Sequence, residues 1–311
     1  MTVLGMDGGG TKTLVAVAGP DGQVTAVTKG PGLDPMAGPG WEARMTAQLQ
    51  PFAPVEAAVI GLPYFSEVPA ISDRQNAVAR SVLGPDTLVM NDVAVAYEGA
   101  LGGAEGVMLL SGTGSMAWSR GPLGVARCGG WGDVFGDEGS AYWIGREALT
   151  RVSRHLDGRQ SAPGLAEGLL AALGIPGSEL IAWTYGQAQP RAAVAALARH
   201  VDALAAVDAD AAGIMARAAG QLVDLARAAA RASGASPEAG WSYAGGVFRS
   251  NVVRGAVTDA MGRPPLAPRL PPVGGALLVA ARRAGWRVDD RFIATLAASL
   301  AEISTGQEHI P

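Results

Sequence analysis

The chain has 311 residues, of which 49% are hydrophobic and 5% aromatic, and its formal net charge is −4. This length allows two domains with cores of their own, and the apolar content excludes a disordered chain. Lys and Arg residues are dispersed, so no basic stripe is available to neutralise phosphates, and nucleic acid is disfavoured as a partner.

Cys128 is the only cysteine, which excludes an intrachain disulfide and a cysteine-ligated iron–sulfur cluster built by one chain. The N-terminal residues lack the basic and apolar parts of a signal peptide. No apolar run approaches the roughly 20 residues that span a bilayer. We therefore expect a cytoplasmic protein with no membrane partner.

Strand and helix signals alternate in the first hundred or so residues, which is typical of an α/β protein. A short apolar strand, Val3–Met6, runs into a glycine-rich bend from Asp7 to Thr13, and Leu14–Ala18 continues as its return strand. Hydrophobic patterns predict further strands at 55–62 and 87–90 and helices at 41–49, 72–83 and 93–101. We expect the first domain to comprise residues 1–105.

The same arrangement recurs in the second half of the chain. An apolar strand at 106–110 runs into the loop Ser111–Ser115, and residues 116–119 form its return strand. The recurrence predicts an α/β protein of two duplicated domains, the second comprising residues 106–311. Its other predicted elements are a strand at 241–244 and helices at 138–154, 192–204, 209–232, from 247, at 272–284 and at 291–303. The last helix, 291–303, is free to pack on the first domain.

The first glycine-rich bend has the groups that a polyphosphate requires. Consecutive glycines let backbone N–H groups approach phosphate oxygens closely, while hydroxyl groups and a lysine add hydrogen bonds and charge. The residues expected to bind here are Gly9, Gly10, Thr11, Lys12 and Thr13. Asp7, at the strand end, is placed to hold Mg²⁺ through water. The alternative is a tight hairpin whose glycines only satisfy the turn geometry.

Two further glycine-marked strand ends follow. Gly112, Thr113 and Gly114 are expected to bind phosphate from the opposite side, the alternative being a second ordinary hairpin. Gly245 and Gly246 follow the strand at 241–244 and would let adenine or ribose lie against the backbone. The alternative is a purely structural role at the end of the strand.

Asp92 follows a predicted buried strand and begins a helix. An N-cap is the common role of an aspartate there. A carboxylate at a strand end also suits acceptance of the proton from an attacking hydroxyl in phosphoryl transfer. Position alone leaves both interpretations open.

The segment 128–143 combines glycines, carboxylates and aromatic residues, which suits a carbohydrate pocket. Its alternative role is structural. Asp137 and Glu138 would then favour the start of the next helix, and Tyr142 and Trp143 would fill the core.

Taken in order, the motifs at 7–13, 91–92, 111–115, 129–143, 243–248 and 272–276 resemble the N-acetylglucosamine kinase family. This family is a sugar-kinase branch of the actin-like ATPase superfamily, and the resemblance spans nearly the whole chain. It implies two actin-like, ribonuclease H-like domains around a central nucleotide cleft, with ATP and Mg²⁺ as cofactors and a homodimer as the assembly. It further implies transfer of phosphate to the 6-hydroxyl of an amino sugar, with Asp92 as the base. The sugar site implied comprises Asn91, Asp92, Trp131, Gly132 and Asp137.

Two positions depart from this pattern. Asp34 lies in a loop, and Met116 follows the second glycine loop, at places where the family often has asparagine. A carboxylate at Asp34 would favour the free ammonium of glucosamine over an acetamide, which makes glucosamine a competing substrate and Asp34 a candidate substrate-binding residue.

Three other classes of protein share part of this pattern. An activator ATPase of radical dehydratases shares the nucleotide loops but needs cysteines to hold a cluster between subunits, and this chain has one cysteine. A sugar-sensing repressor would need an N-terminal helix-turn-helix. A chaperone or filament subunit would use ATP without a small acceptor, and its ATP hydrolysis would be unaffected by every sugar.

Overall fold

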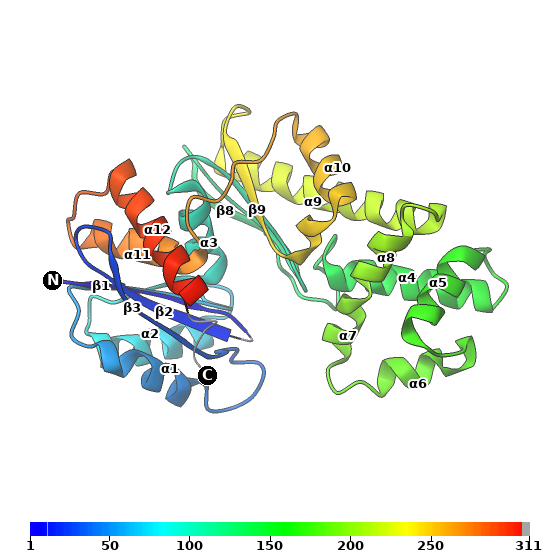
Figure 1. The fold of residues 1–311 in the computed structure, drawn as a ribbon, viewed down its shortest axis with the longest axis horizontal. Helices are drawn as coiled ribbons and strands as arrows, with labels where there is room; N and C mark the ends of the chain where they lie inside the picture. The colour runs from blue at the N-terminus through cyan, green and yellow to red at the C-terminus, as the bar shows by residue number, and fades with distance from the viewer. Residues whose placement is uncertain (11, 307–311) are drawn as a thin grey trace. The chain divides into compact units, whose positions relative to one another are not determined.

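The structure, a computed structural model, describes residues 1–10 and 12–306, which form two compact units. Unit 1 comprises residues 1–104 and the described chain from Ala267 onward, and unit 2 comprises Glu105–Leu266. Each unit contains one β-sheet with helices packed on it (Figure 1). Among the described residues no single helix has the length and apolarity to cross a membrane, although one bent pair, Pro163–Leu173 with Gly177–Tyr185, meets those two criteria jointly.

The sheet of unit 1 has five strands in the order β3-β2-β1-β4-β5. Their bounds are β1 Val3–Gly8, β2 Lys12–Ala18, β3 Val24–Pro31, β4 Ala57–Leu62 and β5 Leu88–Asn91. Strands β1, β4 and β5 are parallel, so their carboxyl ends meet at one edge of the sheet. Strand β3 was not predicted, because as a largely exposed edge strand it lacks an apolar pattern.

Successive side chains of β1 face opposite sides of the sheet, and each side has its own core. Leu4 and Met6 share one core with α1 (Trp41–Leu49) and α2 (Pro69–Leu83). Val3 belongs to the other core, whose helices are α3 Asp92–Leu101, α11 Pro272–Arg283 and α12 Asp290–Gly306.

The last two helices therefore belong to unit 1. The sequence had allowed the last helix to pack on the first domain, but it had placed the helix at 272–284 in the second domain, and α11 departs from that expectation. Helix α11 lies directly on strand β1: a Cβ on Gly5 would lie 2.7 Å from the backbone nitrogen of Leu277. Its buried residues cover the sheet face that carries Val3, beside α3 (Figure 1). Burial of these apolar side chains explains the return of the chain to unit 1.

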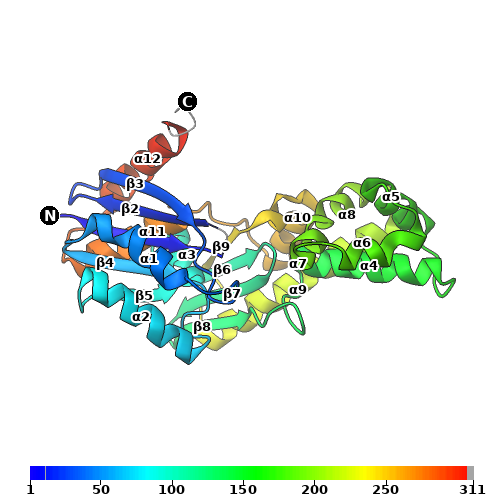
Figure 2. The ribbon, with the colours of Figure 1, turned by 90° about the horizontal axis from the view of Figure 1, so that it is seen from below.

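The sheet of unit 2 has the order β8-β7-β6-β9, and β6 and β9 are parallel. Its strands are β6 Gly106–Ser111, β7 Ser115–Gly121, β8 Gly124–Gly129 and β9 Gly240–Ala244. Its helices are α4 Ala141–Leu156, α5 Pro163–Leu173, α6 Leu180–Tyr185, α7 Pro190–Ala196, α8 Ala198–Leu204, α9 Ala209–Ser233 and α10 Asn251–Met261. Helices α5 to α8 gather at one end of this unit, beyond the sheet (Figure 2).

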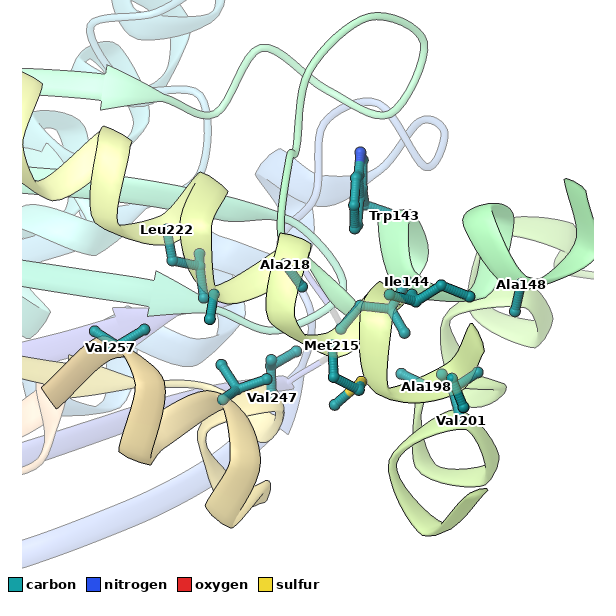
Figure 3. Packing of buried hydrophobic residues seen from close by; sticks show 14 of the residues in the cluster. Trp143, Ile144, Ala148, Ala198, Val201, Met215, Ala218, Leu222, Val247 and Val257 are labelled. Carbon is teal, nitrogen blue, oxygen red and sulfur yellow. The ribbon is translucent and has the colours of Figure 1, made fainter. Parts of the chain in front are cut away.

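Helix α9 is the centre of the unit 2 core. Its buried Met215, Ala218 and Leu222 pack against Ile144 of α4 and Val257 of α10 (Figure 3). Small alanine side chains along α9 allow neighbouring helices to approach closely, as the Ala-rich sequence predicts.

Three predicted helices differ in the structure. The helix expected at 138–154 begins at Ala141, because Asp137 (φ 55°) and Gly139 (φ 77°) are left-handed and the Ser140 hydroxyl accepts the Trp143 N–H as the cap. The helix expected from 247 begins as a 3-10 turn, and α10 starts at Asn251. The helix expected at 192–204 is two helices, α7 and α8.

Candidate functional site

The first glycine loop joins β1 to β2 at the carboxyl end of β1. The Gly9 N–H donates to the Lys12 carbonyl oxygen at 3.0 Å, and the Gly9 carbonyl accepts from Leu33 N at 3.0 Å. Gly10 and Lys12 are exposed, which suits ligand binding. Thr13 is buried and its hydroxyl donates to the Pro31 carbonyl at 2.9 Å, so this hydroxyl is used inside the sheet. Thr11 lies outside the described residues.

Two carboxylates meet at the same sheet edge. Asp7 lies near the end of β1, and Asp92 is the first residue of α3, directly after β5. Burial raises the pKa of Asp7 to about 6, and the charge of Lys12 opposes this rise. Burial is also the main cause that raises the pKa of Asp92 to about 7, and the negative charge of Asp7 adds to it. The two aspartates therefore interact and form one electrostatic site.

Asn91, not Asp92, is the N-cap of α3. Its Oδ1 accepts the Val93 N–H at 2.9 Å, which satisfies a free donor of the first helical turn. Its Nδ2 donates to the Phe65 carbonyl at 3.1 Å and to Glu67 Oε1 at 3.0 Å. The buried amide of Asn91 thus holds the β4–α2 loop and the start of α3 together.

Asp34 lies beside the first glycine loop. A Cβ on Gly10 would be 3.8 Å from Asp34 Oδ2, and Asp34 Oδ1 accepts the Met36 N–H at 2.7 Å. Unit 1 therefore brings Asp34, the exposed part of the loop and the Asp7–Asp92 pair to one end of its sheet.

The second glycine loop, in unit 2, is held by the segment that follows β8. The Ser111 and Ser115 hydroxyls donate to the carbonyls of Gly139 and Glu138, at 3.0 and 2.7 Å. The Gly112 carbonyl accepts the Ala141 N–H at 2.8 Å. The loop and the start of α4 are consequently one rigid structure.

The parallel strands β6 and β9 are each followed directly by a glycine, and these glycines, Gly112 and Gly245, lie against each other. Gly245 has a φ of 101°, and a Cβ there would lie 2.2 Å from the Ser111 carbonyl oxygen. By contrast, a Cβ on Gly112 or Gly246 would meet nothing within 4 Å. Open backbone at the carboxyl ends of neighbouring parallel strands is where nucleotides bind in α/β sheets.

Asp137 lies against the second glycine loop. It is 3% exposed; its Oδ1 accepts the Ser115 N–H at 3.3 Å, and its Oδ2 accepts from Arg191 at 2.6 Å. Burial raises the pKa of Asp137, and the Ser115 N–H and Arg191 oppose the rise. Arg191 Nε also lies 3.6 Å from Asp133 Oδ1.

The contact of Arg191 with Asp137 was not predicted from the sequence. Arg191 lies directly before the helix predicted at 192–204, and no local motif connects it with Asp137, from which it is separated by 54 positions. Trp131 is 65% exposed, with the Arg127 guanidinium 5.4 Å from its ring centre, and Gly132 accepts the Gly136 N–H at 2.9 Å. Asp137, Trp131 and Gly132 therefore belong to one loop region, in which Asp137 is buried and Trp131 is exposed.

The described residues fit ATP and Mg²⁺. Among them no group of three or more His, Cys, Asp or Glu residues is arranged to hold a metal. Mg²⁺ bound with nucleotide needs only one or two carboxylates, since phosphate and water oxygens complete its shell. Asp7 and Asp92 are hard oxygen donors, and a bound cation would offset the cost of burying their negative charge.

Comparison with solved structures identifies the fold. A "putative N-acetylglucosamine kinase" from Chromobacterium violaceum matches with a TM-score of 0.72 and 28% identity, covering 90% of this chain and 98% of that one. A glucokinase of the ROK family from Streptomyces griseus, solved with glucose and AMPPNP, matches with a TM-score of 0.54 and 18% identity, covering 91% and 99%. The fold is that of the actin-like ATPases of the sugar-kinase branch, so the predicted fold class is confirmed.

Residues 4–280 match the BadF/BadG/BcrA/BcrD ATPase family, and the chain belongs to this family. An N-acetylmuramic acid/N-acetylglucosamine kinase of Clostridium acetobutylicum is 30% identical over 212 residues, which are 64% of this chain and 69% of the relative. An N-acetyl-D-glucosamine kinase of Dictyostelium discoideum is 37% identical over 100 residues, 31% of each chain. The resemblance read from the sequence motifs is thereby confirmed, and membership of an ATPase family implies ATP as the nucleotide.

Proposed function

We propose that this protein transfers the terminal phosphoryl group of ATP to the 6-hydroxyl of an amino sugar, N-acetylglucosamine or glucosamine. The observation that carries the proposal is the partly buried Asp92 carboxylate, which follows β5 at the carboxyl edge of the first sheet and has its pKa raised to about 7, first by burial and then by the charge of Asp7. A general base works best when its pKa lies near the operating pH. The relatives named as amino-sugar kinases support the same assignment.

Asp92 is the proposed catalytic base. In phosphoryl transfer the protein mainly positions the reactants and stabilises charge, and Asp92 accepts the proton of the attacking sugar hydroxyl. Mg²⁺, when bound, would neutralise phosphate charge, with Asp7 holding it through water. Backbone N–H groups stabilise the phosphates, and the proposed contributors are Gly9, Gly10, Lys12, Gly112, Thr113, Gly114, Gly245 and Gly246.

Asp137 is the proposed sugar carboxylate, together with Trp131 and Gly132. Each carboxylate oxygen has more than one acceptor position, so the contacts with Ser115 and Arg191 do not use all the lone pairs that a sugar hydroxyl could donate to. The exposed ring of Trp131 provides an apolar face of the kind that sugar rings pack against.

Asp34 distinguishes the two acceptors. Its carboxylate lies beside Gly10, and an ammonium at the 2-position of the sugar would form an ion pair with it that a neutral acetamide cannot form. We therefore favour glucosamine over N-acetylglucosamine. We further propose that the protein is cytoplasmic and forms a homodimer. Light scattering measures the molar mass in solution and so tests the dimer.

The test compares kcat/KM for glucosamine, N-acetylglucosamine and glucose in the parent protein and in Asp34→Asn. We expect glucosamine to be preferred, and Asp34→Asn to lower its kcat/KM about tenfold or more while leaving glucose nearly unchanged. A strong preference for the acetylated sugar, unchanged in Asp34→Asn, would rule out the proposed contact between Asp34 and the sugar ammonium. ATP hydrolysis that no sugar affects would instead support an ATPase without a small acceptor.

A further inference from the structure

Arg191 extends from helix α7 to Asp137, the proposed sugar carboxylate. Its Nη2 lies 2.6 Å from Asp137 Oδ2, at the distance of a charge-assisted hydrogen bond. The Arg191 side chain is 42% exposed, whereas that of Asp137 is 4% exposed. Asp137 therefore depends on protein partners rather than on water to stabilise its charge.

The Asp137 carboxylate also lies against the second glycine loop. A Cβ on Gly114 would lie 2.8 Å from Asp137 Oδ2 and 2.9 Å from Oδ1, so a glycine leaves the space that the carboxylate occupies. The Ser115 N–H donates to Oδ1 at 3.3 Å, which is long for such a bond. Of the hydrogen bonds that the described residues make with this carboxylate, that from Arg191 is the shorter. The orientation of the carboxylate thus depends mainly on Arg191.

Helix α7 holds Arg191 in place because it packs directly on α4. A Cβ on Gly145 of α4 would lie 2.0 Å from the Val194 carbonyl oxygen, so the backbones of the two helices are in contact. Val194 is also buried. Helix α4 begins four residues after Asp137. Arg191 is therefore presented from a fixed helix, close to the segment that carries Asp137.

The same guanidinium faces a second acid of this segment. Arg191 Nε lies 3.6 Å from Asp133 Oδ1, which is an ion-pair distance but is too long for a hydrogen bond. Asp133 and Asp137 are the two ends of a stretch that directly follows Trp131 and Gly132, the other proposed sugar-binding residues of unit 2. One arginine thus contacts both ends of the stretch, and it contacts Asp137 the more closely.

We propose that Arg191 is a positioning residue for the sugar site: it orients the Asp137 carboxylate so that the remaining lone pairs of that carboxylate accept hydroxyl hydrogens of the sugar. This inference rests on the proposed function, in which Asp137 binds the acceptor. Arg191 acts through Asp137 and does not itself touch the sugar. Helix α7 is thereby part of the sugar site, although it lies outside the segment 128–143 that the sequence indicated.

Three substitutions test this role. Arg191→Gln removes the charge that holds Asp137, and Arg191→Lys keeps the charge but replaces the planar guanidinium by a single ammonium. Asp137→Asn removes the carboxylate, and it is also combined with Arg191→Gln. Arg217→Gln is the matched control, because Arg217 Nη2 lies 3.2 Å from Glu147 Oε2 in an ion pair of the same unit that does not include Asp137.

The experiment measures kcat and KM for glucosamine and N-acetylglucosamine, and KM for ATP, in every variant. In Arg191→Gln we expect kcat/KM for the better sugar to fall about tenfold or more, chiefly through KM, while KM for ATP stays within about threefold. Arg191→Lys should recover part of this loss. In Arg217→Gln all constants should stay within about twofold of the parent.

The combined variant tests whether Arg191 acts through Asp137. We expect Asp137→Asn to lower kcat/KM for the sugar, and the addition of Arg191→Gln to change it by less than about twofold further, because the group that Arg191 orients is already altered. A direct contact between Arg191 and the sugar would instead give the full tenfold loss in both backgrounds.

Sugar kcat/KM in Arg191→Gln within about twofold of the parent, an equal loss in Arg217→Gln, or the full further loss in the combined variant would each overturn the inference. If Arg191→Gln does not fold, Arg191→Lys, alone and combined with Asp137→Asn, decides in its place. A parent protein that phosphorylates no sugar would overturn the proposed function itself, whereas an active parent with any of these three results would overturn only the role of Arg191.

Discussion

Asp7 and Asp92 bind protons more tightly in the folded chain than in the unfolded chain. Their folded pKa values of about 6 and about 7 lie above the ordinary value of 3.8. A carboxyl group whose pKa is raised on folding destabilises the fold increasingly as pH rises from the unfolded to the folded pKa, and fully above it. The ligand-free protein therefore loses stability between about pH 4 and pH 7 through these groups.

Asp92→Asn should stabilise the ligand-free protein, because it removes a partly buried charge and keeps an acceptor for Val93. We expect the gain in unfolding free energy to be about 1–4 kcal/mol at pH 8, and to shrink as pH falls through 7 toward 4. Thermal denaturation across this pH range measures it, with Glu56→Gln, at an exposed acid directly before β4, as the control for the change in net charge. A loss of stability at pH 8, or a gain that does not vary with pH, would contradict the electrostatic account.

At the residue scale the sequence predicted positions better than contacts. Asp92 was selected as a candidate base from its place between a strand and a helix, and the structure confirms that place. Whether it capped the helix required the side-chain geometry, which gives the cap to Asn91. Glu67 and Arg191 were not recognised. Their partners Asn91 and Asp137 are 24 and 54 positions away, and only the fold brings these pairs together.

Among the elements, the contact between the ends of β6 and β9 shapes the second glycine loop. Gly245 fits there because it has no side chain: its φ is 101°, and a Cβ would lie 2.2 Å from the Ser111 carbonyl oxygen. Any larger residue must displace the loop, since the neighbouring atoms belong to backbone.

Gly245→Ala should lower the unfolding free energy by about 1–3 kcal/mol and weaken ATP binding, because the loop moves. Gly255→Ala is the control: this glycine lies exposed in α10, a Cβ there meets nothing within 4 Å, and alanine should stabilise the helix by up to about 1 kcal/mol. Thermal denaturation and calorimetric titration with ATP give both quantities. Unchanged ATP affinity in Gly245→Ala would show that the contact between the ends of β6 and β9 does not affect nucleotide binding.

The elements that the sequence predicted best were buried and periodic. Helix α1 was predicted at its observed bounds, and β1, β4, β6 and β9 were each recognised from an apolar run. The start of α4 was placed three residues early, because the left-handed conformation of Asp137 depends on its contacts with Ser115 and Arg191. Aspartate adopts this conformation more often than most residues, but still too rarely for the sequence to predict it.

For the whole molecule, the notable feature is a unit built from both ends of the chain. Residues 1–104 supply the first sheet, and α11 and α12 complete its core from the far end of the sequence. The repeated strand–glycine loop–strand pattern was visible in the sequence. The docking of α11 on β1 was not, because an apolar helix face does not specify which sheet it will cover. The family match over residues 4–280 includes segments of both units.

The central claim is that Asp92 accepts the proton of an amino-sugar hydroxyl. The most direct measurement is single-turnover phosphorylation of glucosamine and N-acetylglucosamine by the parent protein and by Asp92→Asn, with ATP affinity measured alongside. The account predicts that the variant transfers phosphate at least about a hundredfold more slowly while its ATP affinity stays within about threefold. Transfer by Asp92→Asn at nearly the parent rate would contradict it.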